Sequence, residues 1–257
     1  MTSSRYSPQL SKSRFMAGLQ CLKRLYLECY DRDLADPIDE RQQAIFDTGN
    51  GVGELAREMF PHGRLVEEQY FELSQAIRTT EKVLSDTTVP AIFEGAFAFE
   101  KIRIRADILK RNDDGTFDLI EVKSTTRAKS QHIPDVAIQL YVLEGLGMPI
   151  REAYLMHINN EYVFQGGPYD LENLFSLKDV TGVSRESVSK IPPEKLSQMW
   201  DALQAEAVPT VDTGPHCTRP YRCPFYSHCH QQVTDHPISD LPRASREFLN
   251  GLKESGI

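Results

Sequence analysis

The residues best suited to chemistry in this sequence are Asp107, Glu121 and Lys123, which lie in the stretch from Arg103 to Lys123. Two carboxylates on adjacent strands can hold one hard divalent cation, because such cations prefer oxygen ligands. A lysine two residues after Glu121 lies on the same strand face, since side chains alternate with period two. Two anions and one cation at one end of a sheet suit metal-dependent phosphodiester chemistry. Glu-Val-Lys alone also occurs by chance in solvent-facing strands, so the prediction of an active site depends on Asp107 and on the neighbouring elements as well.

These residues must be positioned by a β-hairpin. Apolar residues alternate with charged ones before an Asp113-Asp114-Gly115 turn, which is a strong hairpin signal, and apolar positions resume at Phe117. Further strands are predicted around the hairpin at 91–99 and 151–158, with 161–164 pairing to the latter. A helix is predicted over 136–146. Strand, strand, strand, helix, strand indicates an α/β fold with a mixed sheet.

Helical patterns flank this core on both sides. One begins at Leu10, with Ser11 or Ser13 as N-cap, and contains Cys21. A loop is expected over 31–40. Other helices are predicted over 42–60, 74–85, 170–208 (with Pro193 at a helix start) and 243–253. Gly49, Gly51 and Gly53 weaken the helix over 42–60 unless something must approach its backbone.

Composition describes an ordinary globular protein, with 257 residues, 40% hydrophobic and 26% charged. No apolar run approaches the roughly 20 residues that span a bilayer, and the polar start has no signal core, so we expect a cytoplasmic protein without a membrane partner. The formal charge of −8 argues against a nucleic-acid coat protein. It does not argue against a nuclease, because active-site carboxylates count as negative until metal binds and a local basic groove can hold a phosphate backbone.

Cysteines give a second signal. Cys217, Cys223 and Cys229 lie within a short stretch rich in prolines and aromatics, and in a cytosolic protein such cysteines bind metal more often than they form disulfides. The five-residue gaps fit zinc poorly, although zinc could be completed by His216, His228 or His230. An iron–sulfur cluster takes four thiolates. The fourth would be Cys21, with Cys29 as its competitor.

The order of these elements resembles a known superfamily. Asp107 followed by Glu121-Val122-Lys123 looks like motifs II and III of the PD-(D/E)xK nucleases. An early cysteine and a late three-cysteine group resemble the RecB-like branch with a [4Fe–4S] cluster, which includes the CRISPR-adaptation exonucleases and the AddB nuclease domain. Lys12 to Cys21 and Cys217 to Cys229 resemble the opening and ending of one bacterial RecB-like family. The resemblance covers roughly residues 10 to 230.

The resemblance implies roles for individual residues. Asp107 and Glu121 would ligate Mg²⁺ or Mn²⁺ together with the Val122 carbonyl. Lys123 would orient the attacking water and stabilise charge on the phosphate. Gln139 matches the family glutamine on the helix after motif III, near the metal or the DNA backbone.

Nucleic-acid contacts are expected from the segment after Lys123, where Arg127, Lys129 and His132 lie. Tyr141 is a further candidate for contact with the metal or the DNA backbone. The family places its tyrosine four residues after the glutamine, and that position here is Leu143.

One family residue is missing. The helix ahead of the sheet often carries Gly-x-x-x-His, and Gly49 fits, but Gly53 stands where the histidine would be. Glu54 or Glu94 is the candidate substitute metal ligand.

The resemblance predicts one nuclease domain over 1–257. Its parts are an N-terminal helical part (10–87), a restriction-endonuclease-like core (88–165), and C-terminal helices with the cysteine group (166–257). The cluster would be structural, joining the N-terminal helix to the C-terminal loop. The resemblance implies a Mg²⁺- or Mn²⁺-dependent deoxyribonuclease acting on single strands or ends, in DNA repair or defence, beside a helicase or another repair or defence protein. The alternatives are a catalytically weak nucleic-acid-binding module, and a zinc or iron–sulfur protein of unrelated function.

Overall fold

The computed structural model describes residues 9–189, 193–231 and 244–254. The chain divides into two compact units, and each unit draws on two separate parts of the sequence. The first comprises Met1–Met16 and Ile38–Trp200, and the second comprises Ala17–Pro37 and Asp201–Ile257. The predicted single domain, with parts at 10–87, 88–165 and 166–257, stays a prediction.

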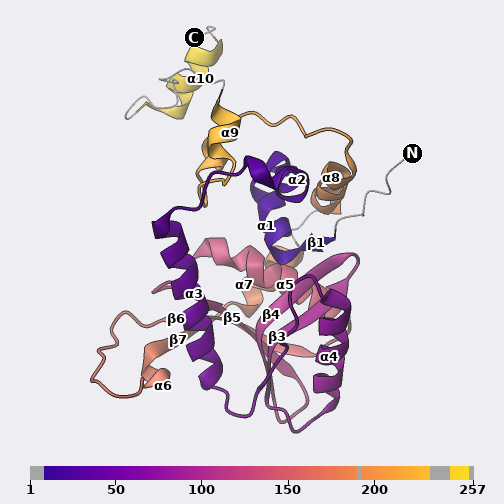
Figure 1. Ribbon diagram of the computed structural model, residues 1–257, viewed down its shortest axis with the longest axis vertical. Helices are drawn as coiled ribbons and strands as arrows, with labels where there is room; N and C mark the ends of the chain where they lie inside the picture. The colour runs from indigo at the N-terminus through magenta and orange to yellow at the C-terminus, as the bar shows by residue number, and fades with distance from the viewer. Residues whose placement is uncertain (1–8, 190–192, 232–243, 255–257) are drawn as a thin grey trace. The chain divides into compact units, whose positions relative to one another are not determined.

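A seven-stranded mixed sheet forms the centre of the first unit (Figure 1). Six strands follow the order β2-β3-β4-β5-β6-β7, and β1 pairs with β4 off this path. The β2/β3, β5/β6 and β1/β4 pairs are parallel, and the β3/β4, β4/β5 and β6/β7 pairs are antiparallel. The bounds are β1 (Leu10–Ser11), β2 (Arg64–Leu65), β3 (Ala91–Phe99), β4 (Ile102–Arg111), β5 (Phe117–Lys123), β6 (Ile150–Ile158) and β7 (Phe175–Asp179).

Helices account for most of the remaining described residues. In the first unit these are α3 (Glu40–Glu58), α4 (Leu73–Ser85), α5 (Ile133–Gly145), α6 (Leu171–Leu174) and α7 (Thr181–Ser189), with a 3₁₀ turn at Ser130–His132. The second unit holds α2 (Leu22–Tyr30), α9 (Tyr226–His230) and α10 (Arg246–Glu254), with 3₁₀ turns at Arg32–Leu34 and Pro215–Cys217. The boundary between the units falls within α1 (Lys12–Gln20) and α8 (Pro193–Gln204).

The two faces of the sheet carry different helices. Val52 and Ala56 of α3 pack with Phe93, Ile108 and Ile120 in one apolar core. Residues that alternate with these along the strands point to the opposite face. That face meets α5, whose buried Gln139 bonds to Glu121. The predicted α/β fold, with a mixed central sheet flanked by helices, is confirmed.

Strand β4 divides one of its edges between two partners. Its last residues, from Ile108 to Arg111, pair with β5, whereas Ile102 and Arg103 at its start pair with β1. The stretch 104–107 on this edge lies between the two ladders. Strand β5 instead continues alongside β6 as far as Lys123, so β4 and β5 separate after the Ile108–Ile120 pair. We call this point the fork.

Several predicted elements differ from the structure. Residues 161–164 are not a strand, and the antiparallel partner of β6 is β7, which lies inside the segment predicted to be helical over 170–208. Cys21 does not lie within a helix but stands between α1 and α2, with the extended φ of −165° that suits the residue before a helix. The helix start at Pro193 is confirmed, and α10 overlaps the short C-terminal helix predicted over 243–253.

The second unit is built from two segments far apart in sequence. Tyr26 and Leu27 of α2 pack with Cys223 and Phe225 in a small apolar core. Polar contacts join the same segments: the Gln20 Nε2 donates to the His216 carbonyl at 2.6 Å, and the Asp36 amide donates to the Pro224 carbonyl at 2.6 Å. The late segment is therefore held to the early one by apolar and hydrogen-bonded contacts together.

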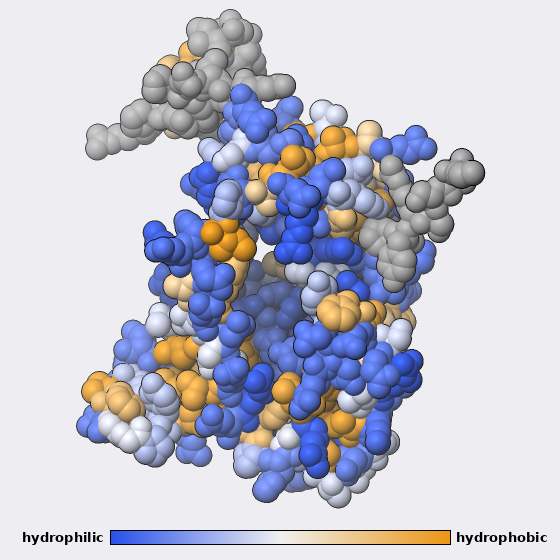
Figure 2. All heavy atoms as spheres, in the orientation of Figure 1, coloured by the Kyte–Doolittle hydropathy of each residue, from blue (hydrophilic) through white to orange (hydrophobic). Residues whose placement is uncertain are grey.

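Exposed apolar side chains gather on the loop before α6, where Val163, Phe164 and Tyr169 are each about half exposed or more (Figure 2). Most of the visible face is hydrophilic. Among the described residues, no helix combines the length and apolar character needed to cross a membrane.

The glycines of α3 generate the first prediction. A Cβ added at Gly53 would meet no atom within 4 Å. Gly53→Ala should therefore raise the free energy of unfolding by up to about 1 kcal/mol, because alanine has the higher helix propensity. Gly145→Ala is the contrasting variant, since its Cβ would lie 2.5 Å from the Phe99 ring, and we expect a loss of about 1–3 kcal/mol. Urea denaturation measures the free energy of unfolding of both variants. A destabilised Gly53→Ala protein would contradict the prediction and show that another part of the molecule packs closely against α3 at Gly53.

Candidate active site

Asp107 and Glu121 stand at the fork, each one residue beyond the Ile108–Ile120 pair that ends the ladder between β4 and β5. Because the ladder has ended, the Val122 backbone amide is not bonded to β4 backbone there. Instead it donates to Asp107 Oδ2 at 2.8 Å. The Asp107 side chain thus accepts the hydrogen bond that a β4 carbonyl would otherwise accept, and it bridges the two strands. This bridge brings the Glu121 carboxylate beside that of Asp107.

Glu121 is the most enclosed charge of the site, with 2% of its side chain exposed. Gln139 Nε2 donates to Oε2 at 2.7 Å, and Lys123 Nζ donates to Oε1 at 2.7 Å. Lys123 also donates to Asp135 Oδ2 in the first turn of α5. The sequence-based grouping of Glu121, Lys123 and Gln139 is therefore present, with Lys123 held between two carboxylates.

A second lysine, which sequence reasoning missed, completes the group. Lys12 is the first residue of α1, directly after β1, and its Nζ lies 3.1 and 3.0 Å from the two Glu121 oxygens. It also lies 3.7 Å from Asp107 Oδ1. Lys12 was noted only as part of a motif leading to Cys21, and no local signal links it to Glu121. Asp135 was missed as well, because the predicted helix began at residue 136, whereas α5 begins at Ile133 and has Asp135 in its first turn.

Burial and mutual charge shift the pKa values of these groups. Burial, the Glu121 charge and the Glu94 charge raise the pKa of Asp107 to about 7, against the opposing effect of Lys12. Burial alone would raise the pKa of Glu121, but Lys12 and Lys123 together hold it well below its usual range. Burial also disfavours the charged form of Lys12 and Lys123, and on its own it would lower their pKa. The neighbouring carboxylates outweigh this effect, so the pKa of each lysine is raised overall. Both lysines and Glu121 are consequently charged at neutral pH.

Of the two candidate substitutes for the missing histidine, the structure brings Glu94 to the site. The pairs Phe93–Ile108 and Gly95–Ala106 place Glu94 across from Asp107 on the neighbouring strand. Its φ of 54° interrupts the regular ladder at that point. Its carboxylate lies 3.6 Å from Arg105 Nε. Glu54 is exposed on α3.

The donor set suits a hard divalent cation. Mg²⁺ is usually bound by one or two carboxylates, with waters and substrate phosphates completing its shell, and Asp107 and Glu121 supply such a pair. Gln139 Oε1 is buried and has no hydrogen-bond partner, so one more oxygen is available. Within the described ranges, no three His, Cys, Asp or Glu side chains are grouped closely enough to hold one metal ion. The two carboxylates are instead neutralised by ammonium groups.

The predicted nucleic-acid contacts fall in different places. Arg127 is exposed and Lys129 is half-buried in the connection after β5. His132 differs from expectation, because it is only 3% exposed and burial lowers its pKa, with the Lys123 charge acting in the same direction. Tyr141 also differs: its hydroxyl bonds to Glu100 and its ring meets Phe99 edge-on. Gln139, two residues earlier on the helix, points to Glu121 instead.

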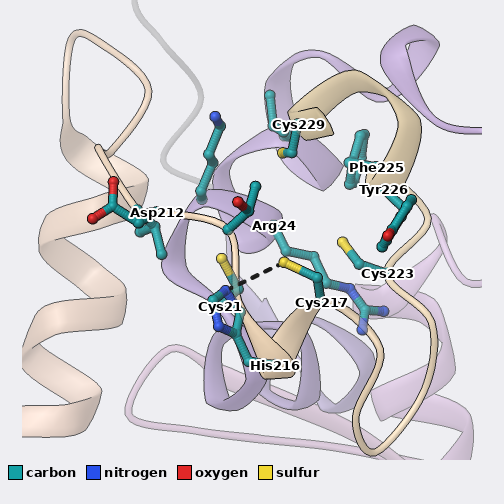
Figure 3. A pocket seen from close by; sticks show the side chains of 13 residues that line it. Cys21, Arg24, Asp212, His216, Cys217, Cys223, Phe225, Tyr226 and Cys229 are labelled. Atoms are coloured by element: carbon teal, nitrogen blue, oxygen red, sulfur yellow. Dashed lines mark hydrogen bonds between the residues drawn. The ribbon is translucent and has the colours of Figure 1, made fainter. Parts of the chain in front are cut away.

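The four predicted cluster cysteines line one pocket of the second unit (Figure 3). Cys21, Cys217, Cys223 and Cys229 face it from the α1–α2 junction and the C-terminal segment, and Cys29 is not among its lining residues. Burial raises the pKa of Cys223 and of Cys229, and the nearby Cys21 thiol acts in the same direction on both. His216 Nε2 lies 3.7 Å from Cys217 Sγ. Lys23 and Arg24 add positive charge to the lining.

The chain has distant likenesses among solved structures. No protein-family model matches the chain, and no curated protein matches it either. Among solved structures, LHK-Exo in complex with dAMP gives a TM-score of 0.41 at 11% identity, over 77% of this chain and 90% of that one. SSO0001 gives a TM-score of 0.34 at 13% identity, over 81% and 91%. Neither likeness is close enough to carry an activity over to this chain.

The charges around Asp107 generate the second prediction. In metal-free protein Asp107 should titrate near pH 7. Glu94→Gln should lower that pKa because it removes a negative neighbour, and Lys12→Met should raise it because it removes a positive one. Carboxyl ¹³C NMR of aspartate-labelled protein measures both shifts. Equal midpoints in the two variants would contradict the charge arrangement at the fork.

Proposed function

We propose that this chain is a divalent-metal-dependent DNA nuclease that hydrolyses phosphodiester bonds and carries a structural [4Fe–4S] cluster. The single observation that carries the nuclease proposal is the arrangement at the fork. Asp107 and Glu121 meet there with Lys123 bonded to Glu121 and Gln139 bonded to the same carboxylate. Metal-dependent hydrolysis of a phosphodiester uses hard oxygen ligands for the metal ion and benefits from a cationic side chain near the phosphate, and this group contains both.

Asp107 and Glu121 would hold Mg²⁺ or Mn²⁺, with Glu94 within reach of Asp107 across the strand pair. A bound divalent cation supplies Lewis-acid stabilisation of the phosphate and lowers the pKa of bound water. The Val122 amide keeps Asp107 directed into the fork, and Gln139 fixes the orientation of Glu121. A role for the Val122 carbonyl as an additional ligand stays a prediction.

Lys123 would act as a charged donor rather than as a base. The carboxylates of Glu121 and Asp135 raise its pKa above the usual lysine range, so its ammonium group keeps its protons at neutral pH. It can therefore orient a water and donate to a non-bridging phosphate oxygen as negative charge develops there. Asp135 holds the Lys123 side chain in the position from which it does so.

DNA is the proposed substrate, as single strands or ends. Arg127 and Lys129 in the connection after β5 are the proposed backbone contacts, because both retain exposed surface close in sequence to Lys123. His132 and Tyr141 are not proposed as such contacts, given the burial of the first and the Glu100 bond of the second. A helicase or another repair or defence protein is the proposed partner.

The cluster proposal is supported by the chemistry of the cysteine pocket. Four thiols around one pocket match the four thiolates that a [4Fe–4S] cluster requires. Lys23 and Arg24 beside them would offset the negative charge of four thiolates. The ligands come from the two segments that make up the second unit, so the cluster would stabilise their association.

A second candidate function is a nucleic-acid-binding module with weak catalysis. The observation that favours it is Lys12, whose ammonium group already neutralises the carboxylate pair. The missing motif histidine at Gly53 points the same way.

The third prediction tests catalysis. Asp107→Ala and Glu121→Ala should each abolish Mg²⁺- or Mn²⁺-dependent cleavage of labelled DNA, because each removes a hard ligand. Lys123→Ala should lose at least about 100-fold in rate, in line with removal of a transition-state donor, while retaining metal. Asp113→Ala, in the exposed hairpin turn, is the matched control and should cut at the wild-type rate. Wild-type cleavage by all three active-site variants would refute the assignment.

The fourth prediction tests the cluster. Anaerobically purified protein should be brown and contain about four irons per chain. Cys21→Ser, or serine at any of the other three pocket cysteines, should bleach the protein and lower its folded yield, whereas Cys29→Ser should remain brown. One zinc per chain in a colourless preparation would instead support a Cys/His zinc site. Bleaching by Cys29→Ser alone would show that the fourth ligand is wrongly chosen.

A further inference from the structure

Lys12 occupies the position between the two carboxylates that a bridging cation would take. Its Nζ contacts both Glu121 oxygens at 3.1 and 3.0 Å and lies 3.7 Å from Asp107 Oδ1. We propose that Lys12 is a built-in competitor of the catalytic cation, which must leave the carboxylate pair before Mg²⁺ or Mn²⁺ binds. This inference rests on the proposed nuclease function and adds a control of metal loading to it.

The position of Lys12 is built into the fold rather than being that of a mobile surface lysine. Strand β1 pairs in parallel with the start of β4, with Leu10 opposite Ile102 and Ser11 opposite Arg103. Leu10 and Phe15, on either side of Lys12, are fully buried. The backbone at Lys12 is therefore anchored beside the stretch of β4 that β5 has left, and its side chain enters the fork.

Charge determines what the carboxylates can hold. Buried carboxylates need a compensating cation, and in the structure Lys12 and Lys123 provide it for Glu121. A divalent cation bound between Asp107 and Glu121 would be repelled by the Lys12 ammonium group at the same oxygens. Metal and Lys12 therefore exclude each other from this position.

Lys12 is also the lysine that can leave. Its side chain is 22% exposed, and a lysine stem has four rotatable methylenes. Lys123 is equally exposed, but it is bonded to Asp135 as well as to Glu121. Loss of the Glu121 contact would leave Lys123 anchored by Asp135, whereas Lys12 is paired with the two proposed metal-binding carboxylates themselves.

An internal competitor weakens the apparent affinity for metal by the fraction of molecules in which the site is free. The expected consequence is a threshold: the fork loads only when the free divalent cation outcompetes a tethered ammonium group. Removing that group should tighten metal binding, because it frees the Glu121 and Asp107 oxygens and removes a positive charge that repels the metal ion.

The experiment measures Mn²⁺ binding directly, by titration of free Mn²⁺ with electron paramagnetic resonance. Lys12→Met should bind at least tenfold more tightly than the wild type. Lys110→Met is the matched control, because Lys110 is paired with a different carboxylate, Asp118, at 3.5 Å, and it should leave Mn²⁺ affinity unchanged. Unchanged or weaker binding by Lys12→Met would overturn the proposal, as would equal tightening by Lys110→Met.

Thermal unfolding provides a second measurement. In EDTA, Lys12→Met should melt below the wild type, because the buried Glu121 and the partly buried Asp107 lose a positively charged partner, and Mn²⁺ should raise its melting temperature more than that of the wild type. If the wild type binds no Mn²⁺ but Lys12→Met does, the competition stands and the proposed metal-dependent activity fails. If the wild type cuts DNA and the two proteins bind Mn²⁺ equally, the activity stands and the competition fails. Absence of Mn²⁺ binding in both proteins would refute both.

Discussion

The buried carboxylate of Glu121 is the constraint on which the first unit depends. An ionised carboxylate removed from water must be hydrogen-bonded and paired, or it destabilises the fold by several kcal/mol. Its partners come from three different segments: Lys12 at the start of α1, Lys123 on β5 itself, and Gln139 on α5. Glu121 lies where β4 separates from β5. Its side chain contacts the residue that follows β1 and a residue of α5, so it links both elements to the sheet.

The hairpin could be predicted from sequence because its signals are local. Alternation with period two and the Asp113-Asp114-Gly115 turn specify two antiparallel strands, and the spacing then places Glu121 and Lys123 on one face. Asp107 followed from the same register. The position of Glu94 opposite Asp107 was harder to predict. Glu94 interrupts the β3–β4 ladder with a positive φ, which the sequence does not reveal. Strand β7 was missed because it is short: of its five residues, Phe-Ser-Leu-Lys-Asp, only Phe175 is buried, so the alternation is too brief to mark a strand.

Lys12 could not be predicted in the same way. Its contact with Glu121 depends on the parallel pairing of a two-residue strand with β4, which is a tertiary event without local periodicity. Helix geometry accounts for Tyr141: residues two apart lie on different faces of a helix, so Gln139 and Tyr141 cannot both face the fork. Sequence spacing could not decide between Cys21 and Cys29 as the fourth cysteine of the pocket. That choice depends on tertiary structure, namely how the segment 17–37 packs against the segment from residue 201 onward.

The second unit has a consequence for the order of events during synthesis. Residues 17–37 leave the ribosome early, but the segment from residue 201 onward that completes their unit is made after the whole intervening sheet. At roughly 5–20 residues per second, the early segment waits on the order of 10 seconds or longer for its partner. The sheet, whose strands are mostly neighbours in sequence, can form during that interval. The cysteine pocket can therefore form only after the sheet has been synthesised, and any cofactor that it holds must be delivered after Cys229 has left the ribosome.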